Sequence, residues 1–155
     1  MQVFETHSED ETYALGVRIG ETAQPDTVYA LSGDLGVGKT VFTKGIAAGL
    51  GITEPVTSPT FTIVQSYMGG RLPLYHFDVY RIGDSDELFD IGFGEMITGE
   101  GVCLIEWADM IMGSLPLDRL IVKIEKNLDR DEDFRKITVE REHAKKKLTD
   151  EDNRD

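Results

Sequence analysis

The segment Gly33-Asp-Leu-Gly-Val-Gly-Lys-Thr40 holds the groups best suited to chemistry. It matches the phosphate-binding pattern G-x-x-x-x-G-K-[ST] in full. Glycines let successive backbone N–H groups turn toward a phosphate without Cβ clashes, and the N-terminus of a following helix adds a positive dipole. In this pattern Lys39 supplies an ammonium for the β- and γ-phosphates, and Thr40 supplies a hydroxyl for Mg²⁺. We therefore predict a site for a nucleoside triphosphate and Mg²⁺ rather than a glycine-rich turn with an incidental lysine.

The segments on either side fit this interpretation. Thr27–Leu31 is a short run of apolar β-formers that predicts a buried strand, and Lys39–Leu50 has the apolar face of a helix. Strand, glycine loop and helix in this order are the context that a phosphate-binding loop requires. No Asn-Lys-x-Asp motif for guanine occurs, so ATP is the expected nucleotide. The predicted nucleotide-binding residues are Gly33, Asp34, Leu35, Gly36, Val37, Gly38, Lys39, Thr40 and Val41.

An enzyme with such a loop also needs a carboxylate that holds the metal or its water. Two acids follow apolar runs: Glu106 ends VCLIE, and Asp78 follows LYHF. Either could be a solvated charge at the end of a strand. Glu106 has the better buried strand, so we predict that Thr40 and Glu106 hold the metal.

A cluster of hydroxyls follows the helix of the phosphate-binding loop, in Thr57-Ser-Pro-Thr60. Thr57, Ser58 and Thr60 could approach the γ-phosphate, as the residues of a switch region do. The same spacing suits a turn fixed by proline with hydroxyls on the surface. The residues alone leave these two interpretations open.

The elements that must position these groups alternate between strands and helices. A capping box at Ser8 and Glu11 predicts the start of a first helix, with Tyr13, Leu15, Val17 and Ile19 on or near its apolar side. Strands are expected at 2–6, 27–31, 61–68, 73–80, 101–107, 118–126 and 134–140, with hairpins at Gly69-Gly70 and at NLDRDED. Short helices are expected from Asp84 or Ser85 through Phe89 and over 93–98. The pattern predicts an α/β fold.

Length and composition bound the class of protein. The 155 residues suggest one domain, over 1–141, followed by a charged and flexible tail at 142–155. No run is long enough for a membrane helix, the N-terminus does not resemble a signal peptide, and the single cysteine, Cys103, suits a reducing cytoplasmic compartment. The net charge of −13 argues against autonomous binding to nucleic acid or to an anionic membrane.

Several segments line up in one order: GDLGVGKTVFTKGIAAGLG, TSPTFTIVQSY, LYHFDVYRI, DELFDIGF and VCLIEW. Together they resemble the TsaE (YjeE) family, the small P-loop ATPases of bacterial tRNA threonylcarbamoyladenosine synthesis. The resemblance covers about Ser8 to Glu140 and is far more specific than the phosphate-binding loop alone.

The resemblance implies a P-loop NTPase-like three-layer sandwich, with a mixed, mainly parallel sheet plus antiparallel hairpins. It implies ATP and Mg²⁺ on the loop, with Lys39, Asp78 and Glu106 as catalytic residues, Thr40 and Glu106 at the metal, and Thr57–Phe61 as a switch-like loop. Family members work with TsaB and TsaD, and TsaD transfers the threonylcarbamoyl group. The chain would then be an ATPase that supports turnover of this complex and reaches tRNA only indirectly.

Other residues have both a functional and a structural interpretation. Thr12 could lie near the adenine, or cap a helix, or face solvent. Arg81, Arg130 and Arg135 could contact the nucleotide or form surface ion pairs. His76 could assist proton transfer near Asp78 or have a hydrogen-bonded structural role. Trp107 could flank the nucleotide or a partner, or be partly buried in the core. Cys103 is expected to be buried and inert.

Two other functions compete with the first. A small-molecule P-loop kinase shares the loop and the size, but it usually needs several arginines in a lid, and only Arg71 and Arg81 lie between residues 60 and 117. A non-catalytic nucleotide-binding module is the other alternative. The intact set of Lys39, Thr40, Asp78 and Glu106 argues against that module.

Overall fold

The computed structural model describes residues 1–142 except 35, 58, 60–62, 81, 83, 84 and 128, and it leaves out the side chains of Ser85, Asp86 and Phe89. Three predicted site residues, Leu35, Ser58 and Thr60, lie outside the described residues. The predicted tail also lies outside them from residue 143 onward.

Within the described residues, seven strands form one sheet in the order β1-β7-β6-β2-β5-β4-β3. The four central strands β6, β2, β5 and β4 are mutually parallel, and β1, β7 and β3 join at the edges as antiparallel partners. The predicted mixed sheet with antiparallel hairpins is thereby confirmed. The strands are β1 (Gln2–Thr6), β2 (Thr27–Ser32), β3 (Val64–Tyr67), β4 (Leu74–Asp78), β5 (Val102–Glu106), β6 (Arg119–Glu125) and β7 (Arg135–Glu142).

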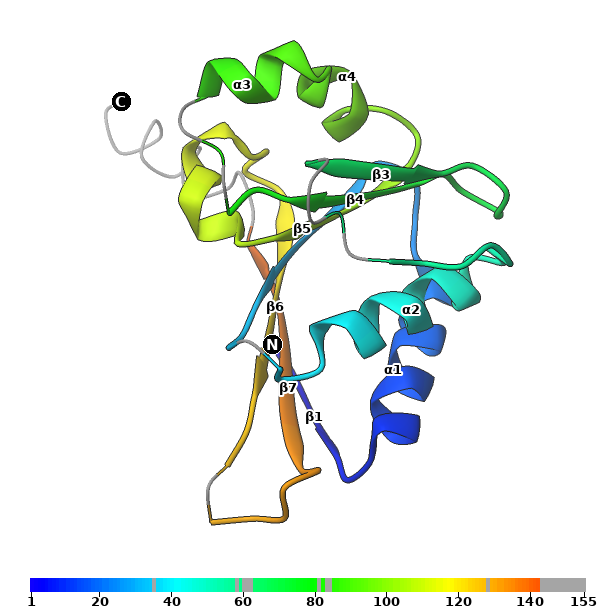
Figure 1. Cartoon of the computed structure of the whole chain (residues 1–155), viewed down its shortest axis with the longest axis vertical. Coiled ribbons are helices and arrows are strands. Elements are labelled where there is room, and N and C mark those ends of the chain that lie inside the picture. Colours follow the sequence, from blue (N-terminus) through cyan, green and yellow to red (C-terminus); the bar gives the residue numbers. More distant parts are fainter. Residues whose placement is uncertain are drawn as a thin grey trace, which may run out of the picture.

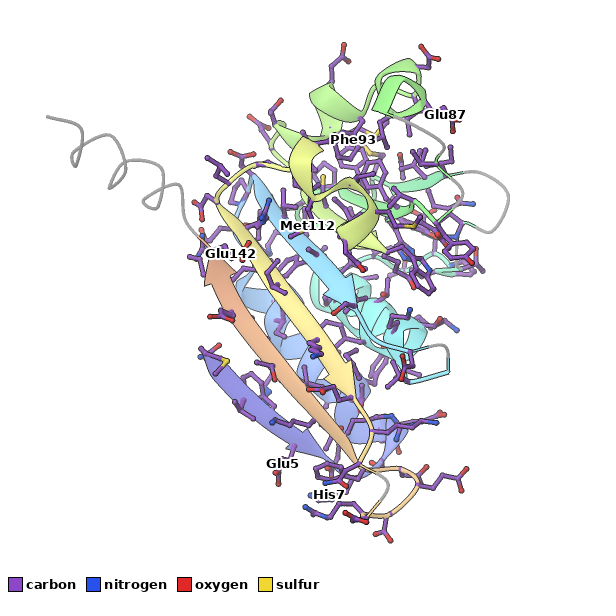
Figure 2. All side chains as sticks on the ribbon, turned by 90° about the vertical axis from the view of Figure 1, so that its left-hand side faces the viewer. Glu5, His7, Glu87, Phe93, Met112 and Glu142 are labelled. Carbon is purple, nitrogen blue, oxygen red and sulfur yellow. The ribbon has the colours of Figure 1, made fainter. Side chains whose placement is uncertain are left out.

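Helices cover both faces of this sheet and make three layers (Figure 1). On one face lie α1 (Glu9–Thr22) and α2 (Lys39–Gly49), and on the other lie α3 (Ser85–Asp90), α4 (Phe93–Ile97) and the 3₁₀ helix η1 (Ala108–Ser114). In Figure 2 the labels Glu87, Phe93 and Met112 mark this second layer at the upper end of the sheet, whereas Glu5 and His7 lie at its lower end. The predicted three-layer α/β fold is confirmed. None of the helices in the described part of the chain is long and apolar enough to cross a membrane.

The first helix begins as the capping pattern predicts. The Ser8 hydroxyl oxygen accepts the Glu11 N–H at 3.1 Å, while the Glu11 carboxylate accepts the N–H of His7 at 2.8 Å, one residue before the usual position. The predicted apolar side of this helix is wrong in one respect, since Tyr13 is 40% exposed. The buried positions are Thr12, Leu15, Gly16 and Gly20, so glycines take the place expected of large apolar side chains.

Four glycines bring α1 and α2 into direct backbone contact. Gly16 and Gly20 of α1 face Gly45 and Gly49 of α2. A Cβ atom at any of these four positions would lie 2.2–2.5 Å from a backbone carbonyl oxygen of the other helix. Because that separation is far below van der Waals contact, the two helices can lie this close only without side chains here. This contact fixes α1 against the helix that begins at Lys39.

The turn between β3 and β4 ties both helices to the edge of the sheet. The Arg71 guanidinium donates to the carbonyl oxygens of Gly20, Glu21 and Ala23 at 2.8–3.1 Å, and the Arg71 N–H donates to Leu50 O at 2.6 Å. The last turn of α1 contains no basic residue of its own. Arg71 therefore supplies the cation and the donors that the C-terminal end of a helix favours.

Candidate functional site

The phosphate-binding loop joins β2 to α2 and depends on glycines with positive φ. The φ values of Gly33, Gly36 and Gly38 are 149°, 77° and 112°, a region that other residues rarely adopt. A Cβ at Gly33 would meet Ile124 O at 2.7 Å, so this end of the loop packs against β6. Apart from its chain neighbours, no atom of the described residues lies within 4 Å of such a Cβ at Gly36, and at Gly38 the nearest is Arg135 Nε at 4.0 Å. The backbone of the loop thus borders open space, which fits the approach of a phosphate.

Lys39, the first residue of α2, is 7% exposed and directed at its own loop. Its ammonium donates to Gly33 O at 2.9 Å and lies 4.6 Å from the centre of the Trp107 ring. The next residue, Thr40, is exposed, so its hydroxyl is free of the core. A lysine held by one carbonyl oxygen and an aromatic face can exchange that carbonyl for a phosphate oxygen with a small movement of its chain.

Parallel pairing brings both predicted carboxylates together at the C-terminal ends of β4 and β5. Glu106 is in register with Leu31 on β2 and with Asp78 on β4. Side chains alternate along a strand, and Leu31 and Leu104 pack in the core under α1 and α2. Glu106, two residues after Leu104, therefore faces the same side of the sheet as α2. The same alternation from Leu74 places Asp78 on that side.

Glu106 is 6% exposed, and its carboxylate is held by a histidine of the neighbouring strand. His76 Nε2 lies 2.6 Å from Glu106 Oε2, and His76 is 1% exposed. Because a carboxylate only accepts hydrogen bonds, we assign the donated proton to Nε2. The other ring nitrogen, Nδ1, is buried without a hydrogen-bond partner among the described residues. Of the two interpretations of His76, the hydrogen-bonded role agrees with this contact, and the partner is Glu106, the candidate metal ligand.

Asp78 lies in a different environment from Glu106. It is half-buried, and its Oδ1 accepts the N–H of Tyr80 at 3.0 Å. This is a local turn of the kind that aspartate favours at the end of a strand. Asp78 therefore borders the loop that follows β4, whereas Glu106 is embedded between strands.

Trp107 lies between the lysine of the loop and Tyr80. Its φ of 64° is in the left-handed region, and its ring centre is 4.7 Å from that of Tyr80. The side chain is half-buried, which agrees with the interpretation of Trp107 as partly buried in the core. Non-glycine residues with positive φ are uncommon and concentrate at functional sites. The strain here turns the chain directly after Glu106 so that the ring can cover the Lys39 ammonium.

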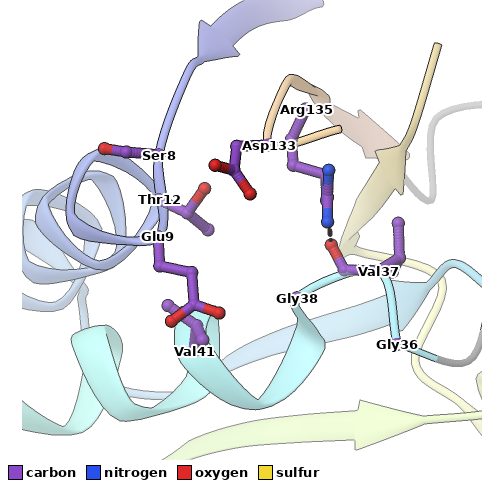
Figure 3. A pocket seen from close by; sticks show the side chains of 9 residues that line it. All are labelled: Ser8, Glu9, Thr12, Gly36, Val37, Gly38, Val41, Asp133 and Arg135. Carbon is purple, nitrogen blue, oxygen red and sulfur yellow. Dashed lines mark hydrogen bonds between the residues drawn. The ribbon is translucent and has the colours of Figure 1, made fainter. Parts of the chain in front are cut away.

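A small pocket lies beside the phosphate-binding loop (Figure 3). Thr12 is 2% exposed, and its hydroxyl is 2.7 Å from that of Thr6, so it neither caps the helix nor faces solvent. Arg135 Nε donates to the Val37 carbonyl at 2.6 Å, as the dashed line in Figure 3 shows. The pocket is lined by Ser8, Glu9, Thr12, Gly36, Val37, Gly38, Val41, Asp133 and Arg135.

Of the two candidate arginines that the structure describes, only one lies at this pocket. Arg135 also donates to the carbonyl oxygens of Glu132 and Phe134 at 2.6 and 2.7 Å, so its guanidinium joins the hairpin to the loop. Arg130 is exposed, its Cζ lies 4.1 Å from the centre of the Phe134 ring, and it is not among the residues that line the pocket. The described structure thus brings Thr12 and Arg135 together with the loop, and leaves Arg130 outside.

Of the predicted switch loop the structure describes Thr57, which is exposed. The Tyr67 hydroxyl accepts the Thr57 N–H at 3.2 Å and lies 3.3 Å from the Thr57 carbonyl oxygen. Tyr67 is itself buried, so the first residue of this segment is fixed to β3.

Cys103 takes no part in the site. It lies on β5 with a thiol that donates to the Met96 carbonyl at 3.3 Å. Burial raises the pKa of this thiol to about 12, with the charge of Asp26 as a smaller cause. Little thiolate therefore exists at neutral pH, in line with the prediction of a buried and inert cysteine.

The oxygen ligands near the phosphate-binding loop suit a magnesium ion that is also coordinated by phosphates. No group of three or more His, Cys, Asp or Glu side chains that could hold a metal occurs in the described part of the chain. Mg²⁺ does not need one, because it usually takes one or two protein oxygens together with waters and substrate phosphates. The exposed Thr40 hydroxyl and one carboxylate, that of Glu106, fit this requirement.

Comparisons of the sequence with a family model and with known proteins agree on one family. The family model "Threonylcarbamoyl adenosine biosynthesis protein TsaE" matches residues 6–137. A TsaE protein of Bacillus subtilis is 50% identical over 133 residues, which are 86% of this chain and 81% of the relative. A TsaE protein of Treponema pallidum is 46% identical over 111 residues, 72% of this chain and 82% of the relative.

Among solved structures, the crystal structure of Bacillus subtilis YdiB superposes with a TM-score of 0.76 at 40% sequence identity. The match covers 97% of this chain and 92% of that one. The match therefore extends over the sheet, both helical layers and the loop that carries Lys39.

Proposed function

This chain belongs to the TsaE family of tRNA threonylcarbamoyladenosine biosynthesis, and on that premise we propose that it is a magnesium-dependent ATPase subunit. In this role it supports turnover of the complex that forms threonylcarbamoyladenosine next to the anticodon, and it is not itself the transferase. One observation carries the proposal: a complete phosphate-binding loop borders open space, and the buried Glu106 lies on the adjacent strand and the same face.

The residues of the loop have separate roles in this proposal. The backbone N–H groups around Gly36 and Gly38 bind phosphate oxygens, and Lys39 moves from Gly33 O to the β- and γ-phosphates. Thr40 and Glu106 hold Mg²⁺, which when bound neutralises charge on the phosphate oxygens. Asp78, at the C-terminal end of β4, orients the attacking water or the switch loop that begins at Thr57.

The pocket beside the loop is the proposed site of the nucleoside. It lies against Gly36 and Gly38, at the place where the sugar and base of a loop-bound nucleotide would extend. Thr12 offers a hydroxyl there, and Arg135 offers a guanidinium edge. Arg130 has no part in this proposal, because it lies on the Phe134 ring outside the pocket.

Partner proteins complete the proposed function. The 29 acidic against 16 basic residues make direct binding to tRNA unfavourable, so we expect a cytoplasmic protein that docks on TsaB-like and TsaD-like proteins and reaches tRNA through them. We expect hydrolysis to be slow for the isolated chain. A partner can raise it by supplying an arginine or by ordering the segment after Thr57.

The test measures ATP hydrolysis by the isolated chain and by its mixture with the TsaB-like and TsaD-like proteins, with tRNA modification as a second readout. We expect both activities to need Mg²⁺, and hydrolysis to rise when the partners are added. Phosphate transfer to added small acceptors would instead indicate a kinase. Micromolar binding of tRNA by the isolated chain at about 150 mM salt would contradict the indirect route to RNA.

A further inference from the structure

The hydrogen bond between His76 and Glu106 joins the neighbouring strands β4 and β5 near their C-terminal ends, where the candidate site lies. At 2.6 Å it is at the short end for a nitrogen donor and a carboxylate, as charge-assisted bonds are. Within the described part of the chain no other hydrogen bond reaches the Glu106 carboxylate. The bond engages Oε2 and leaves Oε1 without a partner there.

The surroundings of His76 argue against a role in packing alone. Its neighbours on the same face include Leu74, two residues earlier, and Leu104, its partner in register on β5, which are both completely buried, and the half-buried Gln65, its partner on β3. Contact with the two leucines alone would be satisfied by an apolar side chain. The ring instead buries Nδ1 with no hydrogen-bond partner among the residues that the structure describes, which is unfavourable. What distinguishes histidine from leucine here is the Nε2–H that reaches Glu106.

We propose that His76 is a positioning residue for Glu106: its Nε2–H holds Oε2 so that Oε1 is presented to the metal of a bound nucleotide. This inference rests on the proposed function and deepens it, since it names the group that orients the metal ligand. Partners that orient a metal ligand through a hydrogen bond typically change metal affinity 10- to 100-fold when they are removed.

The test measures the Mg²⁺ concentration that half-saturates ATP binding, read from the fluorescence of Trp107, the only tryptophan. His76→Leu removes the donor and keeps an apolar group of similar volume, and we expect the half-saturating Mg²⁺ concentration to rise about tenfold or more. His76→Gln keeps an N–H donor at a similar reach, so we expect a value within about threefold of the wild type. Binding of ATP in the absence of Mg²⁺ should be the same in all of these proteins.

Leu74→Ala is the matched control, because it opens a cavity on the same strand and the same face without touching Glu106. It should lower the melting temperature and leave the Mg²⁺ dependence unchanged. A double variant sharpens the test: in a Glu106→Gln background, His76→Leu should cause no further change in the Mg²⁺ dependence. Should His76→Leu fail to fold, His76→Met fills the same space without a donor and is read in the same way.

A wild-type Mg²⁺ dependence in His76→Leu would overturn the proposal, and so would a His76→Gln variant as defective as His76→Leu. Both results would leave the proposed function intact if Glu106→Gln still weakens Mg²⁺-dependent binding. ATP binding by the wild type that is independent of Mg²⁺ would overturn the proposed metal site, and this inference with it.

Discussion

The two faces of the sheet are covered in different ways, and the residues of the candidate site lie on one of them. On the first face α1 and α2 meet backbone to backbone through four glycines. On the second face the shorter helices α3, α4 and η1 pack through apolar side chains such as Leu88, Phe93 and Ile111. The phosphate-binding loop, Glu106 and Asp78 all belong to the first face.

This difference indicates what each layer must do. A helix that begins at Lys39 has to hold its N-terminus at a fixed place, and backbone contact with α1 leaves little room for adjustment. The second layer only has to bury the other side of the sheet, and side-chain packing tolerates substitution better. Changes to the contact between α1 and α2 should therefore affect nucleotide binding, whereas changes in the second layer should affect stability alone.

The largest effect is expected from filling the contact between α1 and α2. In the double variant Gly20→Ala, Gly49→Ala, two methyl groups would enter one contact, each within 2.2 Å of a carbonyl oxygen. Overpacking of this kind costs about 1–3 kcal/mol per site, and more where backbone must move. We expect a loss of about 4 kcal/mol in the free energy of unfolding, measured by urea denaturation, together with weaker ATP binding. A variant as stable as the wild type would show that the helices can separate freely.

The next effect concerns the second face. Phe93 is 5% exposed, and its ring centre is 5.2 Å from that of Phe77 in an edge-to-face arrangement. Phe93→Ala should lower the free energy of unfolding by about 3 kcal/mol because it leaves a cavity. Its affinity for ATP, measured at a temperature where the variant is folded, should remain within about twofold of the wild type. A large change in affinity would contradict the separation of the two faces.

A third prediction distinguishes two acids within the first face. Glu106→Gln should raise the Mg²⁺ concentration needed for ATP binding about tenfold or more, because it weakens a metal ligand. Asp78→Asn should leave that concentration nearly unchanged and lower the rate of hydrolysis, because Asp78 contacts the turn at Tyr80. Titration of Mg²⁺ against nucleotide affinity in both variants checks this. The opposite pattern would reverse the two roles.

The smallest effect, a stabilising one, is expected at a glycine of the second layer. Gly94 lies in α4, and outside its own helix and chain neighbours a Cβ there would have no atom of the described residues within 4 Å. Gly94→Ala should raise the free energy of unfolding by about 0.5–1 kcal/mol, since alanine loses less chain entropy in a helix. Thermal denaturation should show a melting temperature higher by about 1–3 °C. Destabilisation by Gly94→Ala would mean that the second layer is as constrained as the first.

The candidate residues that depend on local pattern could be predicted from the sequence. The loop from Gly33 to Thr40 is recognisable because its chemistry requires fixed residue types at fixed spacing. The apolar strand before Glu106 makes this residue the predicted metal ligand, and the turns predict both hairpins, which the structure confirms. These features need no knowledge of which strands are neighbours.

The contacts between distant segments could not be predicted in this way. The bond from His76 to Glu106 depends on β4 lying beside β5, which strand patterns do not reveal. The spacing of Gly16 with Gly20, and of Gly45 with Gly49, was a visible signal of close helix packing. The predicted apolar side of α1 was instead based on its larger apolar residues, and it wrongly included Tyr13, which is exposed. The 3₁₀ helix after Trp107 was missed because its left-handed start has no glycine to signal it.

The most direct test of the account is calorimetric titration of the chain with ATP in the presence of Mg²⁺, compared with Lys39→Ala. The Lys39 ammonium contacts Gly33 O and the Trp107 ring at the loop and lies outside both hydrophobic clusters, so Lys39→Ala should leave the fold intact. We expect the wild type to bind one ATP per chain and the variant to bind at least about 100-fold more weakly, as loss of a charge-assisted contact to phosphate implies. Equal affinity in a folded Lys39→Ala protein would contradict the assignment of this loop as the nucleotide site.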